Sequence, residues 1–408
     1  MSFASPRRLT RWAIVLVVVL VVVSLVRFCH RAYQLETLFD PDKIVYNFGN
    51  MHRLFYTNLI RKSAHTSVLE ESRKSLPEKF RFNGNTISIR DWILKSGTTG
   101  LVVMTDNKLV FERYYQGNTA QSRAISWSVA KSFVSALIGF AVTDGSIESL
   151  HDPVGKYVPQ LSQSSYANVN IQDFLEMSTG IEFNEDYGDP NSDIRQLGRE
   201  IFFGYSTNKR IASLPTSGPP GEAFDYISAN TQVLGMVLEA ATKQKLARYM
   251  EEKLWSQLGP EADALWLTDA HSTELSFGGL CMCTRDYARF GLLYLNQGRN
   301  LKGKQLLPPQ WIQDSVTPRT DYLQPGNGLF EGNPTLGYAY HFWVPKGEEG
   351  EFLAIGVYGQ FIYVNPMRKV VIAKNSAYIH YTVDGDRMEY EAIEAFRAIA
   401  REVSREKQ

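Results

Sequence analysis

The sequence predicts an α+β fold in which one antiparallel sheet is assembled from both ends of the chain. Runs rich in β-forming residues occur early, at 100–104 and 109–115, and again late, between residues 338 and 373. Between them, at about 150–270, helical segments alternate with long loops that contain glycine and proline, so we expect a mainly helical insertion. With 408 residues, 44% of them hydrophobic, the chain can bury a large core.

The first element with a clear pattern is a hairpin, because the two early β-rich runs flank the polar turn Thr105-Asp106-Asn107-Lys108. A helix is expected at 128–142, where apolar residues such as Val129, Phe133 and Leu137 recur at helical spacing. The remaining expected elements are helices at 232–241, 284–294 and 389–403 and strands at 338–344, 352–355, 361–364 and 370–373.

The N-terminal segment 12–28 is apolar almost throughout and follows three arginines within residues 7–11. At about 1.5 Å per residue, a helix of this length is roughly 25 Å long, just enough to cross a bilayer core. A cleaved signal peptide is the alternative, but large residues occupy the positions where a cleavage site needs small ones. We therefore expect a single-pass membrane anchor and a catalytic domain in the periplasm or elsewhere outside the cytoplasm. The expected divisions are a cytoplasmic tail at 1–11, the anchor at 12–28, a connector at 29–85 and the domain at 86–400.

The charge balance gives nucleic-acid binding no support, because 43 Lys and Arg residues are matched by 43 Asp and Glu residues and no dense basic run occurs in the domain. The three cysteines do not predict a disulfide framework, since Cys281 and Cys283 are separated by one residue and Cys29 lies at the membrane boundary. Neither Cys281 nor Cys283 has a histidine at metal-ligand spacing. We therefore expect no metal and no cofactor, and the sequence does not identify a protein partner.

The pattern with the most chemical content is Ser128-Val129-Ala130-Lys131, a hydroxyl and an amine one helical turn apart. Ser128 stands at the start of the expected helix, where the helix dipole favours the anion that develops on a nucleophile. An amine desolvated in a cleft has a lowered pKa and can accept the serine proton. Tyr226, about a hundred residues later, can act as a phenolate held by Lys131 and can pass the proton to a leaving group.

Each of these residues also has a structural explanation. Ser128 could be a helix cap, Lys131 a solvated lysine and Tyr226 one of 21 tyrosines in packing contacts. The same S-x-x-K spacing recurs at Ser404-Arg405-Glu406-Lys407 in the charged C-terminal tail, where we expect no function. Burying a charged amine in a mostly apolar helix costs free energy, which a residue without a function would not justify. This favours the catalytic interpretation of Lys131.

Several motifs occur in the order and at the spacing of one enzyme family. They are SWSVAKS at 126–132, LEMSTG at 175–180, PGEAFDYIS at 220–228, GGLCMCTRD at 278–286 and GYAYHFW at 337–343. From about Thr86 to Arg397 the chain resembles the serine β-lactamase and penicillin-binding family, in particular its class C-like branch of esterases and 6-aminohexanoate-dimer hydrolases. The resemblance implies a β-lactamase/transpeptidase-like fold and an acyl-enzyme on Ser128, with Lys131 and Tyr226 transferring protons.

The third motif of that family is a strand bearing Lys-Thr-Gly or a substitute, and its best match here is Ala354-Ile355-Gly356. The resemblance implies that the Val357 N–H joins that of Ser128 in the oxyanion hole. A glycine at this place permits close approach of a substrate, and a plain strand bend is the alternative explanation. The expected substrate-binding residues are Ser228, Gly356 and Tyr358.

The leading interpretation is a membrane-anchored serine hydrolase that cleaves small amides or esters through an acyl-enzyme. The second is a β-lactamase or D-Ala-D-Ala-type peptidase, disfavoured because Ala354 and Ile355 lack the cation and hydroxyl that hold a β-lactam carboxylate. The third is a catalytically silent, anchored binding module, which the presence of Ser128, Lys131 and Tyr226 disfavours. The expected partners are a small amide or ester substrate and the membrane.

Overall fold

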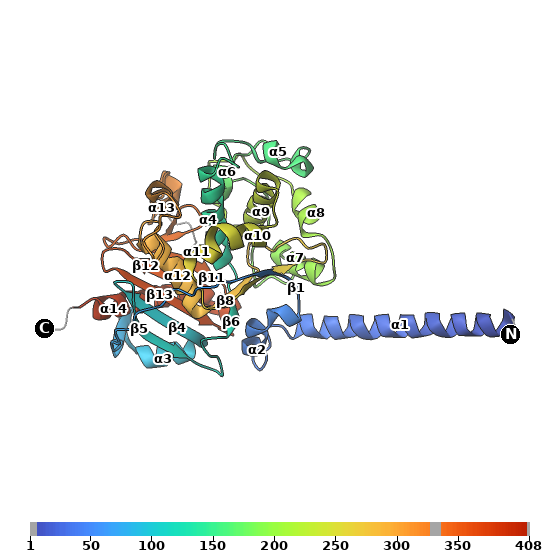
Figure 1. Cartoon of the computed structure of the whole chain (residues 1–408), viewed down its shortest axis with the longest axis horizontal. Coiled ribbons are helices and arrows are strands. Elements are labelled where there is room, and N and C mark those ends of the chain that lie inside the picture. Colours follow the sequence, from blue (N-terminus) through green and yellow to red (C-terminus); the bar gives the residue numbers. More distant parts are fainter. Residues whose placement is uncertain (1–5, 327–335, 406–408) are drawn as a thin grey trace.

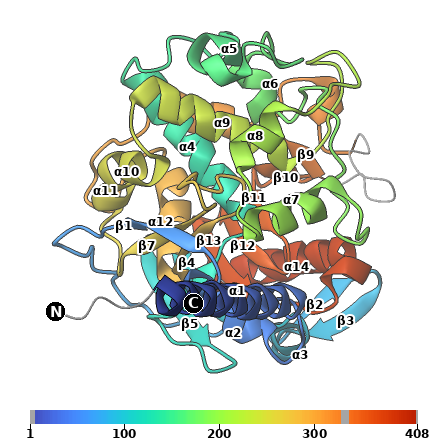
Figure 2. The same ribbon diagram turned by 90° about the vertical axis from the view of Figure 1, so that its right-hand side faces the viewer.

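In the computed structural model, one long helix projects from a body of layered sheets and helices (Figure 1). The structure describes residues 6–326 and 336–405. The first five residues of the expected tail 1–11 lie outside this range, as does Lys407 of the second S-x-x-K. The projecting helix is α1 (Pro6–Glu36), and Figure 2, which looks along it, shows it meeting the body near α2 (Ile44–Gly49).

The centre of the body is a seven-stranded antiparallel sheet with the order β5-β4-β13-β12-β11-β10-β9. β4 (Thr98–Thr105) pairs with β13 (Val370–Ser376), so the early and late parts of the chain meet inside the sheet. The other strands are β5 (Lys108–Tyr114), β9 (Leu336–Tyr338), β10 (Trp343–Pro345), β11 (Phe352–Gly356) and β12 (Gln360–Asn365). The predicted α+β fold, with one sheet built from both ends of the chain, is confirmed, as is the early hairpin.

Helices cover both faces of this sheet. They are α4 (Val129–Thr143) and α12 (Thr284–Leu295) on one face and α3 (Ile89–Lys95) and α14 (Tyr381–Val403) on the other. Because side chains alternate along a strand, Val102 and Met104 of β4 face the first pair of helices, while Leu101 and Val103 face the second. β4 is therefore buried along its whole length.

The region 150–270, expected to be mainly helical, gathers at one end of the sheet (Figure 1). Its helices are α5 (Val154–Tyr157), α6 (Ile171–Leu175), α7 (Asp193–Phe202), α8 (Thr207–Ala212), α9 (Ser228–Thr242), α10 (Leu246–Met250) and α11 (Ser256–Leu258). α9 packs against α4 and begins four residues before the predicted helix 232–241. Near the C-terminal strands, α13 (Pro309–Ser315) adds one further short helix.

A smaller antiparallel sheet, with the order β1-β7-β8-β6, is missing from the sequence-based expectation. Its strands, together with the separate hairpin β2–β3, are β1 (Tyr56–Ile60), β2 (Lys79–Phe82), β3 (Asn85–Ser88), β6 (Arg123–Ile125), β7 (Ala264–Thr268) and β8 (Leu280–Cys283). Strands of three to five residues show too little alternation to be recognised. β1 lies in the expected connector 29–85, and its pairing with β7 makes this segment part of the folded body.

The single strand expected at 338–344 is wrong. β9 ends at Tyr338 and β10 begins at Trp343, and the turn between them holds His341 at a φ of 60°. A left-handed residue cannot continue a strand, and neither glycine nor proline marks this turn in the apolar sequence. The C-terminal helix also begins earlier than predicted, at Tyr381, with a kink at Asp384.

By length and composition, α1 can cross a membrane. Its stretch Ile14–Glu36 has 23 residues and a mean hydropathy of 2.3, and none of its apolar window is buried in the body. A signal sequence near an N-terminus has the same pattern. Beyond the most apolar part, α1 packs on the end of α7. The ring of Phe28 stacks on Phe203 with centroids 5.3 Å apart, and Arg31 Nε donates a hydrogen bond to the Phe202 carbonyl at 3.2 Å.

Four aromatic residues join the segment after α1 to the body, and we call Phe39, Phe48, Trp127 and Tyr358 the aromatic cluster. Phe39 stacks on Tyr358 with centroids 5.0 Å apart. Phe48, in α2, lies edge-on to Trp127 at 5.3 Å and to Tyr358 at 5.4 Å. Aromatic pairs in these geometries bury large areas, so the cluster holds the connector against the loops that carry Trp127 and Tyr358.

Lys374, in β13, is buried beneath α3 and has no exposed surface. Its amine donates a hydrogen bond to Ser376 and lies 5.4 Å from the centre of the Trp92 ring. Burial lowers the pKa of Lys374 from 10.5 to about 7. Between these two values the unfolded chain binds a proton that the folded chain does not bind. The free energy of unfolding therefore rises with pH across this window.

We expect Lys374→Met to stabilise the protein most at or below pH 7, because methionine fills a similar shape without a charge to desolvate. The Tm at pH 6.5 should rise by about 2–4 °C or more. The Tm should also depend less on pH between 7 and 10 than in the natural chain. Thermal unfolding at pH 6.5, 8 and 9.5 measures both effects. Lys79→Met, at an exposed position of β2, is the control and should change neither. A lower Tm for Lys374→Met at pH 6.5 would contradict the expectation.

Candidate active site

Ser128 occupies the N-cap position of α4, where the chain turns sharply from β6 into the helix. The residue before it, Trp127, has a φ of 44°, a left-handed conformation that costs energy for any residue other than glycine. The Ser128 side chain makes no capping hydrogen bond. It is therefore not explained as a helix cap, and its hydroxyl is held at the mouth of a cavity instead.

Lys131 is buried, with 1% of its surface exposed. Its Nζ donates hydrogen bonds to Ser128 Oγ at 2.9 Å, to Ser228 Oγ at 3.1 Å and to the Phe277 carbonyl at 3.0 Å. Burial lowers the pKa of Lys131 from 10.5 to about 8, and the charge of Glu185 opposes this shift. Lys131 is thus no ordinary solvated lysine, because with a pKa of about 8 a much larger share of its amine is neutral near pH 7 than in a lysine whose pKa is 10.5.

Ser228, the first residue of α9, links Lys131 to a carboxyl group that the sequence analysis missed. Its N–H donates to Glu185 Oε2 at 2.8 Å and its Oγ donates to Glu185 Oε1 at 2.6 Å. The Tyr187 hydroxyl donates to the same Oε1 at 2.9 Å. Burial raises the pKa of Glu185, while Lys131 and Ser228 stabilise its charged form. The result is a continuous hydrogen-bonded path from Ser128 through Lys131 and Ser228 to Glu185.

Tyr226 lies beside the same amine. Lys131 Nζ is 5.0 Å from the centre of its ring, and the ring packs against Tyr338 and Trp343 with centroids 6.0 and 5.2 Å away. Burial raises the pKa of Tyr226, and hydrogen bonding with Ser128 opposes this. The phenol is therefore protonated at neutral pH, which suits a proton donor better than a resident phenolate.

The expected third motif lies next to the serine. Gly356 is the last residue of β11, and a Cβ at this position would lie 2.5 Å from the Ser126 carbonyl oxygen and 3.1 Å from the Ser128 nitrogen. Glycine is needed because two backbones approach closely here, not because the strand bends. Val357 lines the same cavity as Ser128, whereas Tyr358, at a φ of 62°, belongs to the aromatic cluster.

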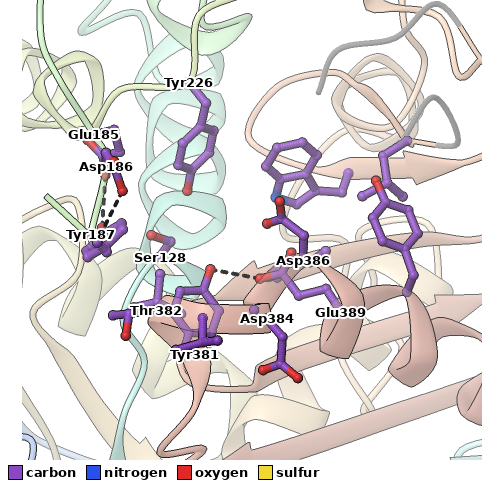
Figure 3. Close-up of a pocket in the computed structure, with 18 residues that line it drawn as sticks. Ser128, Glu185, Asp186, Tyr187, Tyr226, Tyr381, Thr382, Asp384, Asp386 and Glu389 are labelled. Carbon is purple, nitrogen blue, oxygen red and sulfur yellow. Dashed lines mark hydrogen bonds between the residues drawn. The ribbon is translucent and has the colours of Figure 1, made fainter. Parts of the chain in front are cut away.

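Two cavities meet at Ser128. The first, which we call the polar cavity, has a volume of about 430 Å³ and is lined by Ser128, Tyr226 and Val357. Figure 3 shows Glu185 and Asp186 on one side of it and Asp386 and Glu389 on the other. Burial raises the pKa of Glu389 to about 8, and the Tyr381 hydroxyl donates to it at 3.0 Å. Among the described residues that line the polar cavity there is no lysine or arginine.

The second cavity, which we call the apolar cavity, has a volume of about 720 Å³. It also reaches Ser128, but Tyr226 is not among its lining residues. Phe39 of the connector, Ile194 of α7 and Phe277 contribute to its wall. In the part of the chain that the structure describes, no group of three His, Cys, Asp or Glu side chains is placed to hold a metal ion.

Comparison with known proteins places this site in a family. The family model described as Beta-lactamase matches residues 95–395, about three quarters of the chain. The chain belongs to the beta-lactamase family. It is 28% identical over 290 residues to the 6-aminohexanoate-dimer hydrolase of Paenarthrobacter ureafaciens, an alignment that covers 69% of this chain and 73% of that protein.

Solved structures of the same fold include one described as "Putative 6-aminohexanoate-dimer hydrolase from Bacillus anthracis". It has a TM-score of 0.79 and 23% identity and covers 91% of this chain and 97% of that one. EstCE1, described as a hydrolase with promiscuous acyltransferase activity, has a TM-score of 0.61 and 15% identity, covering 76% and 96%. The predicted β-lactamase/transpeptidase-like fold and the hydrolase class of this beta-lactamase family member are confirmed.

The structure of this beta-lactamase family member brings Ser128, Lys131, Tyr226, Ser228, Gly356 and Val357 together. Tyr358 lines the apolar cavity at Ser128 and not the polar one. The catalytic and binding roles of these residues stay predictions. Glu185 and Tyr187 could not be found from one sequence, because they lie on a loop without periodicity. Only the path of that loop brings them to Ser228.

We expect Glu185→Gln to lower the pKa of Lys131, since the negative charge of Glu185 raises it. If neutral Lys131 activates Ser128, the rate at which a fluorophosphonate probe labels Ser128 should increase with pH through about 8 in the natural chain. In the variant the midpoint should move to lower pH by roughly one unit. Glu182→Gln, at an exposed position of the same loop, is the matched control and should keep the natural midpoint. An unchanged midpoint in Glu185→Gln would show that Glu185 does not set the charge state of Lys131.

Proposed function

We propose that this protein is a membrane-anchored serine hydrolase that cleaves amide or ester bonds through an acyl-enzyme on Ser128. The observation that carries the proposal is the buried Lys131 amine, whose Nζ lies 2.9 Å from Ser128 Oγ and whose pKa is lowered to about 8. A buried amine with a perturbed pKa beside a hydroxyl in a cavity is the arrangement that activates a serine nucleophile.

In the proposed reaction, Ser128 Oγ attacks the substrate carbonyl carbon while neutral Lys131 takes the hydroxyl proton. The N–H groups of Ser128 and Val357 stabilise the negative charge that develops on the carbonyl oxygen. Tyr226, protonated because burial raises its pKa, donates its proton to the leaving nitrogen or oxygen as the carbonyl bond to it breaks. Water then attacks the acyl carbon and gives one proton to the Tyr226 phenolate. The bond from that carbon to Ser128 Oγ breaks, Lys131 returns its proton to Oγ, and the carboxylic acid leaves with all three side chains restored.

The anchoring role of α1 is supported by its length and apolar composition and by the contacts of Phe28 and Arg31 with the end of α7. Cleavage of α1 as a signal peptide after Arg31 would remove both contacts. The arginines before the apolar segment favour the cytoplasm for the N-terminus, which leaves the hydrolase domain outside the cytoplasm.

The substrate class follows from the cavities and from the relatives. A 6-aminohexanoate-dimer hydrolase is among the relatives, and this favours amides and related esters. A β-lactamase or D-Ala-D-Ala-type peptidase is the second candidate, since the chain is also 25% identical over 235 residues to an Escherichia coli protein described as "Putative D-alanyl-D-alanine carboxypeptidase". Ala354 and Ile355 offer no cation to a β-lactam carboxylate, and the aspartates that line the polar cavity would repel one.

A catalytically silent, anchored binding module is the third candidate. It is disfavoured because the buried amine serves no evident purpose without catalysis. Desolvating an amine costs free energy, and an apolar residue at Lys131 would stabilise α4 without that cost.

Ser128→Ala should abolish turnover of every ester and amide substrate and all labelling by a fluorophosphonate probe. The fold should persist, because Ser128 makes no capping hydrogen bond and loss of a cap costs only about 1 kcal/mol in any case. Ser404→Ala, in the second S-x-x-K, is the matched control and should retain full activity. Residual Ser128→Ala activity of more than a few per cent would place the nucleophile elsewhere.

A short-chain p-nitrophenyl ester should be a better substrate than nitrocefin. Loss of a charge-assisted hydrogen bond to the β-lactam carboxylate weakens its recognition by roughly ten- to a hundredfold, whereas an uncharged ester loses nothing. The measurement is kcat/KM for both compounds under one set of conditions, with Ser128→Ala as the blank. A higher value for nitrocefin would mean that another cation receives the carboxylate, and the β-lactamase interpretation would then take the lead.

A further inference from the structure

The apolar cavity begins where the chain leaves the membrane-spanning part of α1. Ala32 and Leu35 at the end of α1, and Phe39 just after it, line one side of the cavity, and α7 lines another. If the apolar segment 12–28 crosses the bilayer, Ala32 lies only about 6 Å beyond it, at a rise of 1.5 Å per residue. The cavity therefore starts at the level of the lipid headgroups.

Exposed aromatic residues of the body lie beside the end of the apolar segment, at the expected level of the lipid headgroups. Phe203 is 38% exposed, lines the apolar cavity and stacks on Phe28 of α1. Tyr205, two residues further along, is 65% exposed. Exposed aromatic side chains beside a membrane-spanning helix are typical of the interface between water and lipid. This end of the cavity thus faces the region from which a lipid-like molecule would arrive.

The inner end of the apolar cavity is the nucleophile itself, because Ser128 and Trp127 both line it. Its volume of about 720 Å³ lies within the range of cavities that enclose small organic ligands. The wall between the two ends is largely apolar, with Phe55, Ile201 and Phe277 among its residues. The charged residues Glu36, Asp40, Arg195 and Arg199 also line the cavity, and the apolar residues supply a surface that can accept a hydrocarbon chain.

The two cavities at Ser128 receive different halves of a substrate. Tyr226, the proton donor to the leaving group under the proposed function, lines the polar cavity and not the apolar one. The leaving group must lie within reach of Tyr226 and hence in the polar cavity. The acyl half is then directed into the apolar cavity.

We propose that the apolar cavity is an acyl-chain pocket, and that the substrates are esters or amides of medium- to long-chain fatty acids taken from the lipid bilayer. This proposal rests on the proposed hydrolase function and names its substrate class. Each methylene group moved from water into such a pocket is worth up to about fourfold in binding. For chains that arrive from the bilayer, the pocket instead aligns the carbonyl carbon with Ser128.

Gly198 offers a way to test the pocket without removing any contact. It lies in α7 and lines the apolar cavity, and a Cβ added there would have no heavy atom within 4 Å. Its φ lies outside the left-handed range, so larger side chains are compatible with the backbone. Gln196, two residues earlier in α7, is exposed and does not line the cavity, and it supplies the matched control.

The experiment uses the full-length chain in lipid nanodiscs and compares kcat/KM for p-nitrophenyl acetate and p-nitrophenyl octanoate. In the natural chain the octanoate should be the better substrate by about tenfold or more. Gly198→Trp should lower the octanoate-to-acetate ratio at least tenfold, and Gly198→Ala only slightly. Gln196→Trp should keep the ratio within twofold of the natural value. Partition of the esters into lipid is the same for all variants, so it cancels when their ratios are compared, and the natural chain's own ratio is corrected for the measured partition of each ester.

The outcomes separate the two proposals. Ester turnover that survives in Ser128→Ala would overturn the hydrolase function itself. Ser128-dependent turnover with equal kcat/KM for acetate and octanoate would overturn the acyl-chain pocket alone, as would an equal loss in Gly198→Trp and Gln196→Trp. The octanoate-to-acetate ratio of kcat/KM in the natural chain is measured without any variant. The proposal can therefore be tested even if Gly198→Trp fails to fold.

A second measurement tests the membrane route. p-Nitrophenyl palmitate, which is nearly insoluble in water, is incorporated into the lipid of the same nanodiscs. Ser128-dependent release of p-nitrophenol, reduced in Gly198→Trp, is the expected result. Turnover of the octanoate without any turnover of the palmitate would show that the chain enters from water and would overturn the membrane route.

Discussion

The active site depends on the burial of one amine. Removal from water weakens the preference of a lysine for its charged form, and Lys131 is removed almost completely. The surrounding structure compensates with three hydrogen-bond acceptors from three parts of the chain, namely α4, α9 and the loop at Phe277. Glu185 adds a negative charge through Ser228, close enough to oppose the shift without removing it. The proposed chemistry therefore depends on the packing of α4 against α9 and on the path of the loop at 183–189.

The connector after α1 belongs to the architecture of the site. Through the aromatic cluster it contacts Trp127, directly before the serine, and Tyr358, directly after Val357. It contributes β1 to the smaller sheet and a wall to the apolar cavity. A segment that looks like a spacer in the sequence thus supports both sides of Ser128, the proposed nucleophile. The same packing lets the end of α1 and Ser128 line one cavity.

The sequence predicts those parts of the fold and the candidate site that depend on residues close together in the chain. Ser128 and Lys131 lie one helical turn apart, so their meeting follows from helix geometry, and the periodicity of 128–142 identifies the helix that carries them. Glu185, Tyr187 and Phe39 reach the site through long-range packing, and no local pattern encodes that. The β9–β10 turn at His341 was hidden for another reason, because a left-handed residue other than glycine leaves no mark in the sequence.

The pairing of β4 with β13 has a consequence for how the protein is made. Thr105 pairs with Val370, 265 positions later, so the sheet that supports the site cannot close until β13 has been synthesised. Bringing such distant residues together costs a large amount of conformational entropy before the contact stabilises the fold. Contacts of this kind therefore make folding slow. Ser128 and Lys131 are therefore synthesised well before the sheet beside them is complete. Hydrolytic activity can begin only after β13 has joined the sheet.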